Sequence, residues 1–274
     1  MTPGTPGGVA PPSGGGAMPL PPHGITAKSI LKLKWNFPIH NIYRREEGSN
    51  ATIAQKVSKA LAKEHAFYTV AAEDRRPLLI LRECKSCNDT DEALLSTYES
   101  NEETMIITRW FNCIKLPIDI MEEDHPFHNL FEKGTKTHLF VSRWDGTKAI
   151  PLKRDLSRSE LLGNMYEILE IDYKKDAEKS VKEIAKLMYV YDMLDERIQR
   201  LEIAIDDEIE KNGPKSKRLK KYQSQLKEAQ KDMADAKARK AKLSDLKLKN
   251  PKERLDALEK YLEEQDAKES SNKI

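Results

Sequence analysis

The last third of the chain repeats apolar residues at heptad spacing, with one interruption at Asn212-Gly213-Pro214. Such spacing places an apolar stripe along an α-helix, and a Gly-Pro sequence ends one helix and begins the next. A connection this short permits only an antiparallel return. We therefore expect two long helices that form a hairpin. The stripe consists of Ile184, Leu187, Tyr191, Leu194, Ile198, Leu201 and Ile205, followed by Leu219, Tyr222, Leu226, Ala229, Met233 and Ala236.

The two arms of this expected hairpin carry opposite charge. Positions 181–211 hold nine acidic and five basic residues, whereas positions 214–249 hold four acidic and thirteen basic residues. Opposite signs favour docking of one arm on the other. Ala229 and Ala236 bury little surface, so the second half of the stripe is expected to pack weakly and to attract further helices. We therefore predict protein partners for the hairpin, including a second copy of the chain.

The first 24 residues are almost wholly Pro, Gly and small residues. This composition is typical of a disordered tail, and it lacks the basic start and apolar stretch of a secretory signal. No segment of the chain approaches the roughly 18 to 20 apolar residues that cross a bilayer. We therefore expect a cytoplasmic protein without a membrane span, whose thiols stay reduced. The net charge of only +2 predicts no specific binding to nucleic acid.

Between the tail and the hairpin, strand and helix signals alternate. Alternating apolar residues predict a strand near positions 30–35, and helical spacing predicts a helix from Ser49 or Asn50 to Val70. The continuous apolar run at positions 78–81 is typical of a central strand that is covered on both faces. A further helix is expected over positions 88–98.

The following segment predicts strands and a final helix. Positions 104–116 are rich in β-branched and aromatic residues, as strands are. After a weak helical turn near positions 127–131, two short apolar runs flank Trp144-Asp145-Gly146-Thr147, which predicts a β-hairpin. Ser157 or Ser159 caps the last helix of this region. The order of elements predicts an α/β fold with a mixed sheet and helices on both faces.

Two of the three cysteines, Cys84 and Cys87, stand at the expected turn from the central strand into a helix. In a reducing compartment, such a close pair is redox-active, metal-binding or inert. The order of elements, together with Cys84-Lys85-Ser86-Cys87, resembles the thioredoxin-like superfamily over positions 25–169. The resemblance implies a thioredoxin-like sheet and thiol–disulfide oxidoreductase activity, with Cys84 as the exposed nucleophile and Cys87 as the resolving thiol.

Local chemistry around Cys84 acts in both directions. A helix N-terminus and the neighbouring Lys85 favour its thiolate, whereas the adjacent carboxylate of Glu83 disfavours it. Redox-active members of the family commonly have Trp before the first cysteine and Gly-Pro within the pair, which this chain lacks. The position of the family's cis-proline corresponds to Thr137 or His138, and no proline stands there.

Two other interpretations of the cysteine pair remain. His138 beside Cys84 and Cys87 would supply a third metal ligand, although zinc needs a fourth ligand or an open position. In the other interpretation the cysteines are inert, and the fold is a scaffold or adaptor that acts through the hairpin. The chain has no phosphate-cradling glycine loop and no nucleophile elbow, so no cofactor is predicted.

An acidic stretch with two histidines is the remaining candidate for metal ligation. A solvated loop is the favoured interpretation, because Pro126 interrupts any helical face and the carboxylates lack regular spacing. The stretch contains Asp119, Glu122, Glu123, Asp124, His125 and His128.

The third cysteine, Cys113, is expected to be a buried small hydrophobe.

Taken together, these features divide the chain into four parts. We predict a disordered tail over residues 1–24, a thioredoxin-like domain over 25–169, an antiparallel coiled-coil hairpin over 170–249, and a short helix with a polar tail over 250–274. Of the two functions, thiol–disulfide exchange through Cys84 and Cys87 is the first candidate, with the hairpin as the arm that docks the partner. A non-catalytic adaptor is the alternative.

Overall fold

The structure is a computed structural model. It describes residues 23–38, 43–44, 55–56, 60–83, 94–95, 100–131, 138–153 and 156–249, together with the single residues 256, 260 and 263. The predicted tail up to residue 22, most of the predicted C-terminal helix, and the predicted helix at positions 88–98 apart from Leu94 and Leu95 therefore lie outside the described residues.

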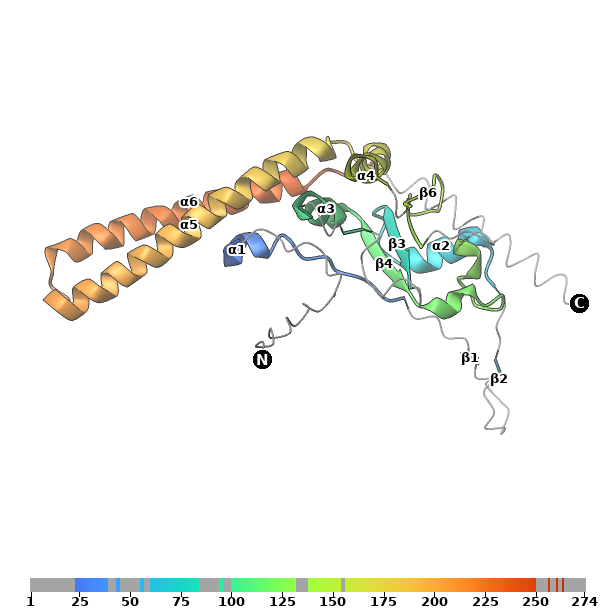
Figure 1. The fold of residues 1–274 in the computed structure, drawn as a ribbon, viewed down its shortest axis with the longest axis horizontal. Helices are drawn as coiled ribbons and strands as arrows, with labels where there is room; N and C mark the ends of the chain where they lie inside the picture. Colours follow the sequence, from blue (N-terminus) through green and yellow to red (C-terminus); the bar gives the residue numbers. More distant parts are fainter. Residues whose placement is uncertain are drawn as a thin grey trace, which may run out of the picture.

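A four-stranded mixed sheet lies at the centre of the globular part (Figure 1), in the order β4-β3-β5-β6. Strand β3 (Leu78–Arg82) pairs in parallel with β4 (Asn112–Leu116) and antiparallel with β5 (Leu139–Ser142). The short strand β6 (Ile150–Pro151) pairs antiparallel with β5. Every residue of β3 is buried, which confirms the predicted central strand. The antiparallel pair of β5 and β6 confirms the predicted β-hairpin, and the mixed sheet with its helices confirms the α/β class.

The sheet separates two apolar cores because successive side chains of a strand point to opposite faces. Leu79 and Leu81 of β3 belong to the larger core, which also takes in the helices α3 (Glu102–Ile107), α4 (Arg158–Asp172) and α5 (Ala177–Asn212). Leu78 and Ile80 belong to the smaller core, together with α2 (Lys63–Ala71) and two 3₁₀ turns, η3 (Ile118–Met121) and η4 (His128–Leu130). Burial on both faces explains the uninterrupted apolar run of β3.

Two sequence-based predictions fail next to this sheet. The strand predicted over positions 104–116 is instead helix α3 (Glu102–Ile107) and the 3₁₀ turn η2 (Thr108–Trp110), with strand β4 only at its end. A short apolar run fits a buried helix as well as a strand, and packing against α5 decides between them. The acidic residues Glu102 and Glu103 also favour a helix start there.

The helix predicted from Ser49 or Asn50 to Val70 is also wrong in its first half. Residues Gln55–Lys56 form strand β2, which pairs antiparallel with β1 (Tyr43–Arg44). The helix itself, α2, begins only at Lys63. Backbone pairing with β1 overrides the helical spacing of these first residues, whereas the later residues keep it and form α2.

The N-terminal segment starts with a short helix and continues as extended chain. Helix α1 (Ile25–Lys28) precedes a stretch whose only described pairing with the sheet is a parallel bridge from Asn36 to Ile114 of β4. The strand predicted near positions 30–35 is thus reduced to this bridge. Its alternation still holds, because Leu33 and Trp35 pack against the larger core.

The expected helical hairpin is confirmed, and it projects away from the sheet (Figure 1). Helix α5 (Ala177–Asn212) and helix α6 (Lys217–Ser244) run antiparallel, with Gly213 at the turn. Ion pairs cross between them, from Arg239 to Glu183 at 2.7 Å and from Arg197 to Glu228 at 3.1 Å. The opposite charges of the two arms therefore meet in ion pairs, as predicted.

The base of the hairpin is tied into the globule. Helix α4 (Arg158–Asp172), capped by a reciprocal Ser157–Glu160 pair, precedes α5. The Trp110 indole Nε1 donates a hydrogen bond to the Ser244 carbonyl oxygen at 2.8 Å. Buried residues from the first half of α5 share the larger core with Leu79 of β3. The base of the hairpin and the sheet therefore share one core across position 170.

Candidate functional site

The sequence motif places the candidate site where strand β3 ends. Cys84 follows Arg82, the last residue of β3, by two positions. Cys84, Lys85, Ser86 and Cys87 all lie outside the described residues, as does Thr137. The described residues at the end of the strand include Glu83, the immediate neighbour of Cys84.

Arg82 is buried, which is unusual for a charged side chain. Its Nη2 donates a hydrogen bond to His138 Nδ1 at 2.9 Å, and its guanidinium lies 5.3 Å from the centroid of the Phe131 ring. Its backbone N–H donates to the His138 carbonyl oxygen at 2.7 Å. At the end of the strand, the Arg82 guanidinium is therefore held by contacts with the His138 imidazole and the Phe131 ring. Sequence analysis missed Arg82, whose only signal was a basic residue directly after an apolar run.

His138 is held as a neutral imidazole. Burial lowers its pKa below the ordinary value, and the positive charge of Arg82 lowers it further. Arginine can only donate, so Nδ1 of His138 must accept, which leaves Nε2 to carry the ring proton. His138 is one of the two residues that the resemblance aligns with the family's proline, and its partner here is Arg82.

Glu83 does not act alone on the neighbouring cysteine. Its Oε1 lies 3.5 Å from Lys115 Nζ of strand β4, and its N–H donates to the Leu116 carbonyl oxygen at 2.9 Å. Among the described residues at this end of the sheet, Lys115 lies against Glu83, and Arg82 is a second cation that bonds to His138. Positive charge near a thiol favours its thiolate.

The same charge opposes the metal interpretation. A guanidinium bonded to His138 Nδ1 occupies one possible ligand atom and repels a cation at close range. In the acidic stretch, His128 is buried, and Nδ1 of His125 accepts a hydrogen bond from the Phe127 N–H at 3.1 Å. Within the described part of the chain, no three His, Cys, Asp or Glu residues are grouped as a metal ion would require.

The described cysteine, Cys113, is buried in strand β4, as predicted. Its Sγ donates to the Thr108 carbonyl oxygen at 3.5 Å. A thiol so enclosed packs as a small apolar side chain.

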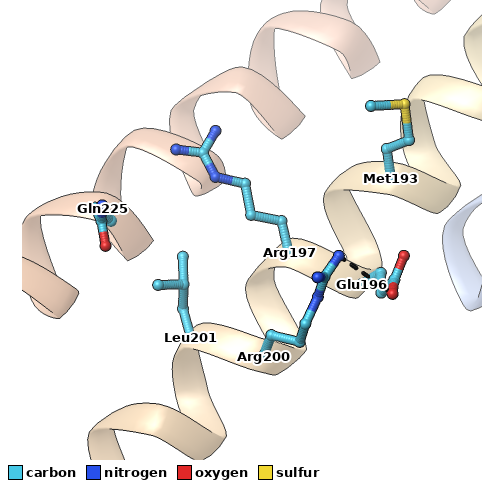
Figure 2. A pocket seen from close by; sticks show the side chains of 6 residues that line it. All are labelled: Met193, Glu196, Arg197, Arg200, Leu201 and Gln225. Atoms are coloured by element: carbon cyan, nitrogen blue, oxygen red, sulfur yellow. Dashed lines mark ion pairs between the residues drawn. The ribbon is translucent and has the colours of Figure 1, made fainter.

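The hairpin offers a second candidate surface. A hollow of about 480 Å³ is lined by Met193, Glu196, Arg197, Arg200, Leu201 and Gln225 (Figure 2). Its arginines already have partners, because Arg197 reaches α6 and Arg200 pairs with Glu196 at 3.2 Å. The hollow is therefore an apolar surface with a neutralised rim rather than a site for a charged ligand.

Comparison with protein families, with curated proteins and with solved structures found no match to this chain. Among the described residues, no helix is both long enough and apolar enough to cross a membrane.

Proposed function

We propose that the protein is a thioredoxin-like thiol–disulfide oxidoreductase that acts through Cys84 and Cys87. One observation carries the proposal: Cys84 follows the last residue of β3 by two positions, and β3 is an inner strand of the mixed sheet that is buried on both faces. A central strand of this kind is where the resemblance to the thioredoxin-like superfamily requires the motif.

The exchange proceeds in two steps. The Cys84 thiolate attacks one sulfur of a partner disulfide, forms a mixed disulfide and releases the other partner sulfur as a thiolate, which takes up a proton. The Cys87 thiolate then attacks the Cys84 sulfur, closes the Cys84–Cys87 disulfide and frees the second partner thiol. The partner gains two electrons, and a dithiol reductant returns the pair to its starting state.

The surroundings of the strand end support the first step. Among the described residues beside Cys84 in the sheet, Lys115 lies 3.5 Å from Glu83, and Arg82 is a second cation. Nearby positive charge favours a thiolate at Cys84, and a reducing cytoplasmic compartment would keep both thiols available.

Cysteine variants test this function in the full-length protein. We expect wild type to reduce a disulfide-linked model peptide with dithiothreitol as the reductant, and Cys84→Ser to lose this activity. Cys87→Ser should instead accumulate a mixed disulfide with the peptide, visible as added mass. Cys113→Ala is the matched control, because the buried Cys113 should leave the rate unchanged. Wild-type activity no greater than that of Cys84→Ser would contradict the proposal.

A second candidate function is self-assembly through the hairpin, with the globule as a scaffold. Tyr189, Met193 and Ile203 of α5 are large apolar residues that are 58%, 71% and 55% exposed. A second copy of the hairpin is the occupant that fits this surface, because the acidic excess of α5 and the basic excess of α6 match in an isologous pairing. Each α5 would then lie against the α6 of the other copy.

Sedimentation of the full chain over a range of concentrations tests the assembly. Wild type should increase in mass with concentration, and the double variant Met193→Glu and Ile203→Glu should remain monomeric. The matched control adds the same charge to exposed apolar residues outside the hairpin, with Phe37→Glu and Ile118→Glu. A wild type that stays monomeric throughout, or a control that dissociates equally, would count against self-assembly.

A further inference from the structure

A polar hollow of about 440 Å³ lies at the opposite end of strand β3 from Cys84. Its walls come from the extended segment after α1, from Arg76 shortly before β3, and from η2 and the start of β4. The lining residues are Ser29, Lys32, Lys34, Asn36, Arg76, Thr108, Arg109, Phe111 and Cys113.

The extended segment turns its polar side toward this hollow. Leu33 and Trp35 pack into the larger core. Because alternate residues of an extended chain point in opposite directions, Lys32, Lys34 and Asn36 share the other side. The alternation that predicted a strand at the sequence level therefore also places two lysines in one wall.

Positive charge in the hollow exceeds the negative charge that the described residues provide. Arg76 has a partner in Asp74, with 2.6 Å between Nη2 and Oδ2. No carboxylate in the described part of the chain pairs with Arg109, Lys32 or Lys34. Arg109 donates from Nη1 to the Ile30 carbonyl oxygen at 3.2 Å, and burial lowers its pKa.

Helix α6 adds to the same charge. Burial lowers the pKa of Lys240, and the positive charge of Arg109 lowers it further, so the two groups lie close enough to repel. Arginine stays charged at any ordinary pH, so a half-buried guanidinium that has only a carbonyl partner and cationic neighbours is electrostatically costly. An anion in the hollow would relieve that cost.

We propose that this hollow binds a small phosphate-bearing molecule. Phosphate carries up to two negative charges and several acceptor oxygens, which suit the planar fork of Arg109 together with two lysine ammonium groups. The volume lies within the range of about 300 to 1,000 Å³ that is usual for small-molecule sites. The proposal is independent of the dithiol, because the two sites lie at opposite ends of β3.

Calorimetric titration of the full-length protein with pyrophosphate at low ionic strength tests the site. Wild type should bind saturably with one pyrophosphate per chain. We expect the double variant Lys32→Gln and Lys34→Gln to weaken the affinity about tenfold or more, which corresponds to about 1.4 kcal/mol. Both lysines are exposed, so this variant should fold normally. Arg109→Gln should have a similar effect.

The matched control removes two exposed lysines from helix α6, with Lys227→Gln and Lys231→Gln. It has the same net charge as the pocket variant, and its affinity for pyrophosphate should stay within about twofold of wild type. Absence of saturable binding to wild type would overturn the proposal, as would an equal loss in the control. A single-stranded oligonucleotide that binds more tightly than pyrophosphate, and that both double variants weaken equally, would overturn it in favour of a diffuse nucleic-acid surface.

Discussion

His23 Nδ1 lies 2.6 Å from Asp192 Oδ2, a contact that joins the start of the described chain to the middle of helix α5. Nε2 of the same ring lies 2.9 Å from Glu102 Oε1 of α3. A carboxylate oxygen accepts hydrogen bonds, so these two contacts favour the imidazolium form of His23, in which both ring nitrogens donate. The backbone N–H of Gly24 adds a bond to Asp192 Oδ1 at 2.7 Å. His23 and Gly24, assigned to the disordered tail at the sequence level, are thus part of the packed structure.

This contact predicts a pH-dependent stability. Burial acts to lower the pKa of His23, but the hydrogen bonds and charges of Asp192 and Glu102 outweigh it, and the pKa is raised. Asp195, which binds Thr26, adds a further carboxylate nearby. A raised pKa means that the contribution is complete below the unfolded value of about 6.5 and is lost as the pH rises through the folded value.

Urea unfolding of wild type and His23→Gln measures this contribution. The measurements cover about pH 6 to pH 9, a range that includes the ordinary histidine pKa. We expect His23→Gln to lower the free energy of unfolding by about 2 kcal/mol at the acidic end and by less as the pH rises. The control His65→Gln changes a histidine of α2 outside this cluster. A constant difference between wild type and His23→Gln at every pH would contradict the assignment.

Arg143 and Asp172 form a second testable pair, with 2.8 Å between Nε and Oδ1. Burial raises the pKa of Asp172, and the charges of Arg143 and Lys249 only partly offset it. Arg143→Met would leave a buried carboxylate without its cation and should cost about 3 kcal/mol at neutral pH.

The pH dependence of the Arg143→Met variant has the opposite sign to that of His23. A carboxyl with a raised folded pKa binds its proton more readily in the folded state, so the cost should shrink as the pH falls through that value. The double variant Arg143→Met and Asp172→Asn should unfold at higher urea than Arg143→Met alone. Equal midpoints for these two variants would show that the lost charge pairing is not the cause.

Three glycines should respond differently to alanine. Gly146 has φ of 75°, and a Cβ there would overlap the Phe67 ring, so Gly146→Ala should cost about 2 to 4 kcal/mol. Gly213 has a similar φ of 76° but open space around it, so Gly213→Ala should cost about 1 kcal/mol. Gly163 lies exposed within α4, and Gly163→Ala should stabilise by about 0.5 to 1 kcal/mol. Thermal unfolding gives the order, and equal effects at Gly146 and Gly213 would contradict the ring overlap.

The charges beside Cys84 should control its reactivity. In a Cys87→Ser and Cys113→Ala background, Glu83→Gln should speed alkylation by iodoacetamide at neutral pH by about two- to threefold, because it removes a carboxylate next to the thiol. Lys115→Gln should slow the reaction, since Glu83 would lose its partner. Glu64→Gln on α2 is the control for a change in net charge. Equal rates in all variants would remove the electrostatic basis of the proposed chemistry.

The local sequence pattern was sufficient to predict several elements of the fold. The heptad spacing and Gly213-Pro214 predicted α5, α6 and the turn between them, because helical period and turn chemistry act within a few residues. The apolar run of β3 indicated burial on both faces, and Ser157 with Glu160 formed the expected cap. The dithiol motif itself was likewise evident from residues that are adjacent in sequence.

The rest was decided by contacts between distant residues. The run that became α3 fits either a strand or a helix, and packing on α5 selected the helix. Arg82 and His138 are 56 positions apart, and His23 and Asp192 are 169 positions apart, so no local pattern reveals either pair. The sequence by itself therefore determined the helical hairpin, the central strand and the position of the dithiol. Only the tertiary structure decided which charges surround each site, because electrostatic partners depend on distance in space rather than along the chain.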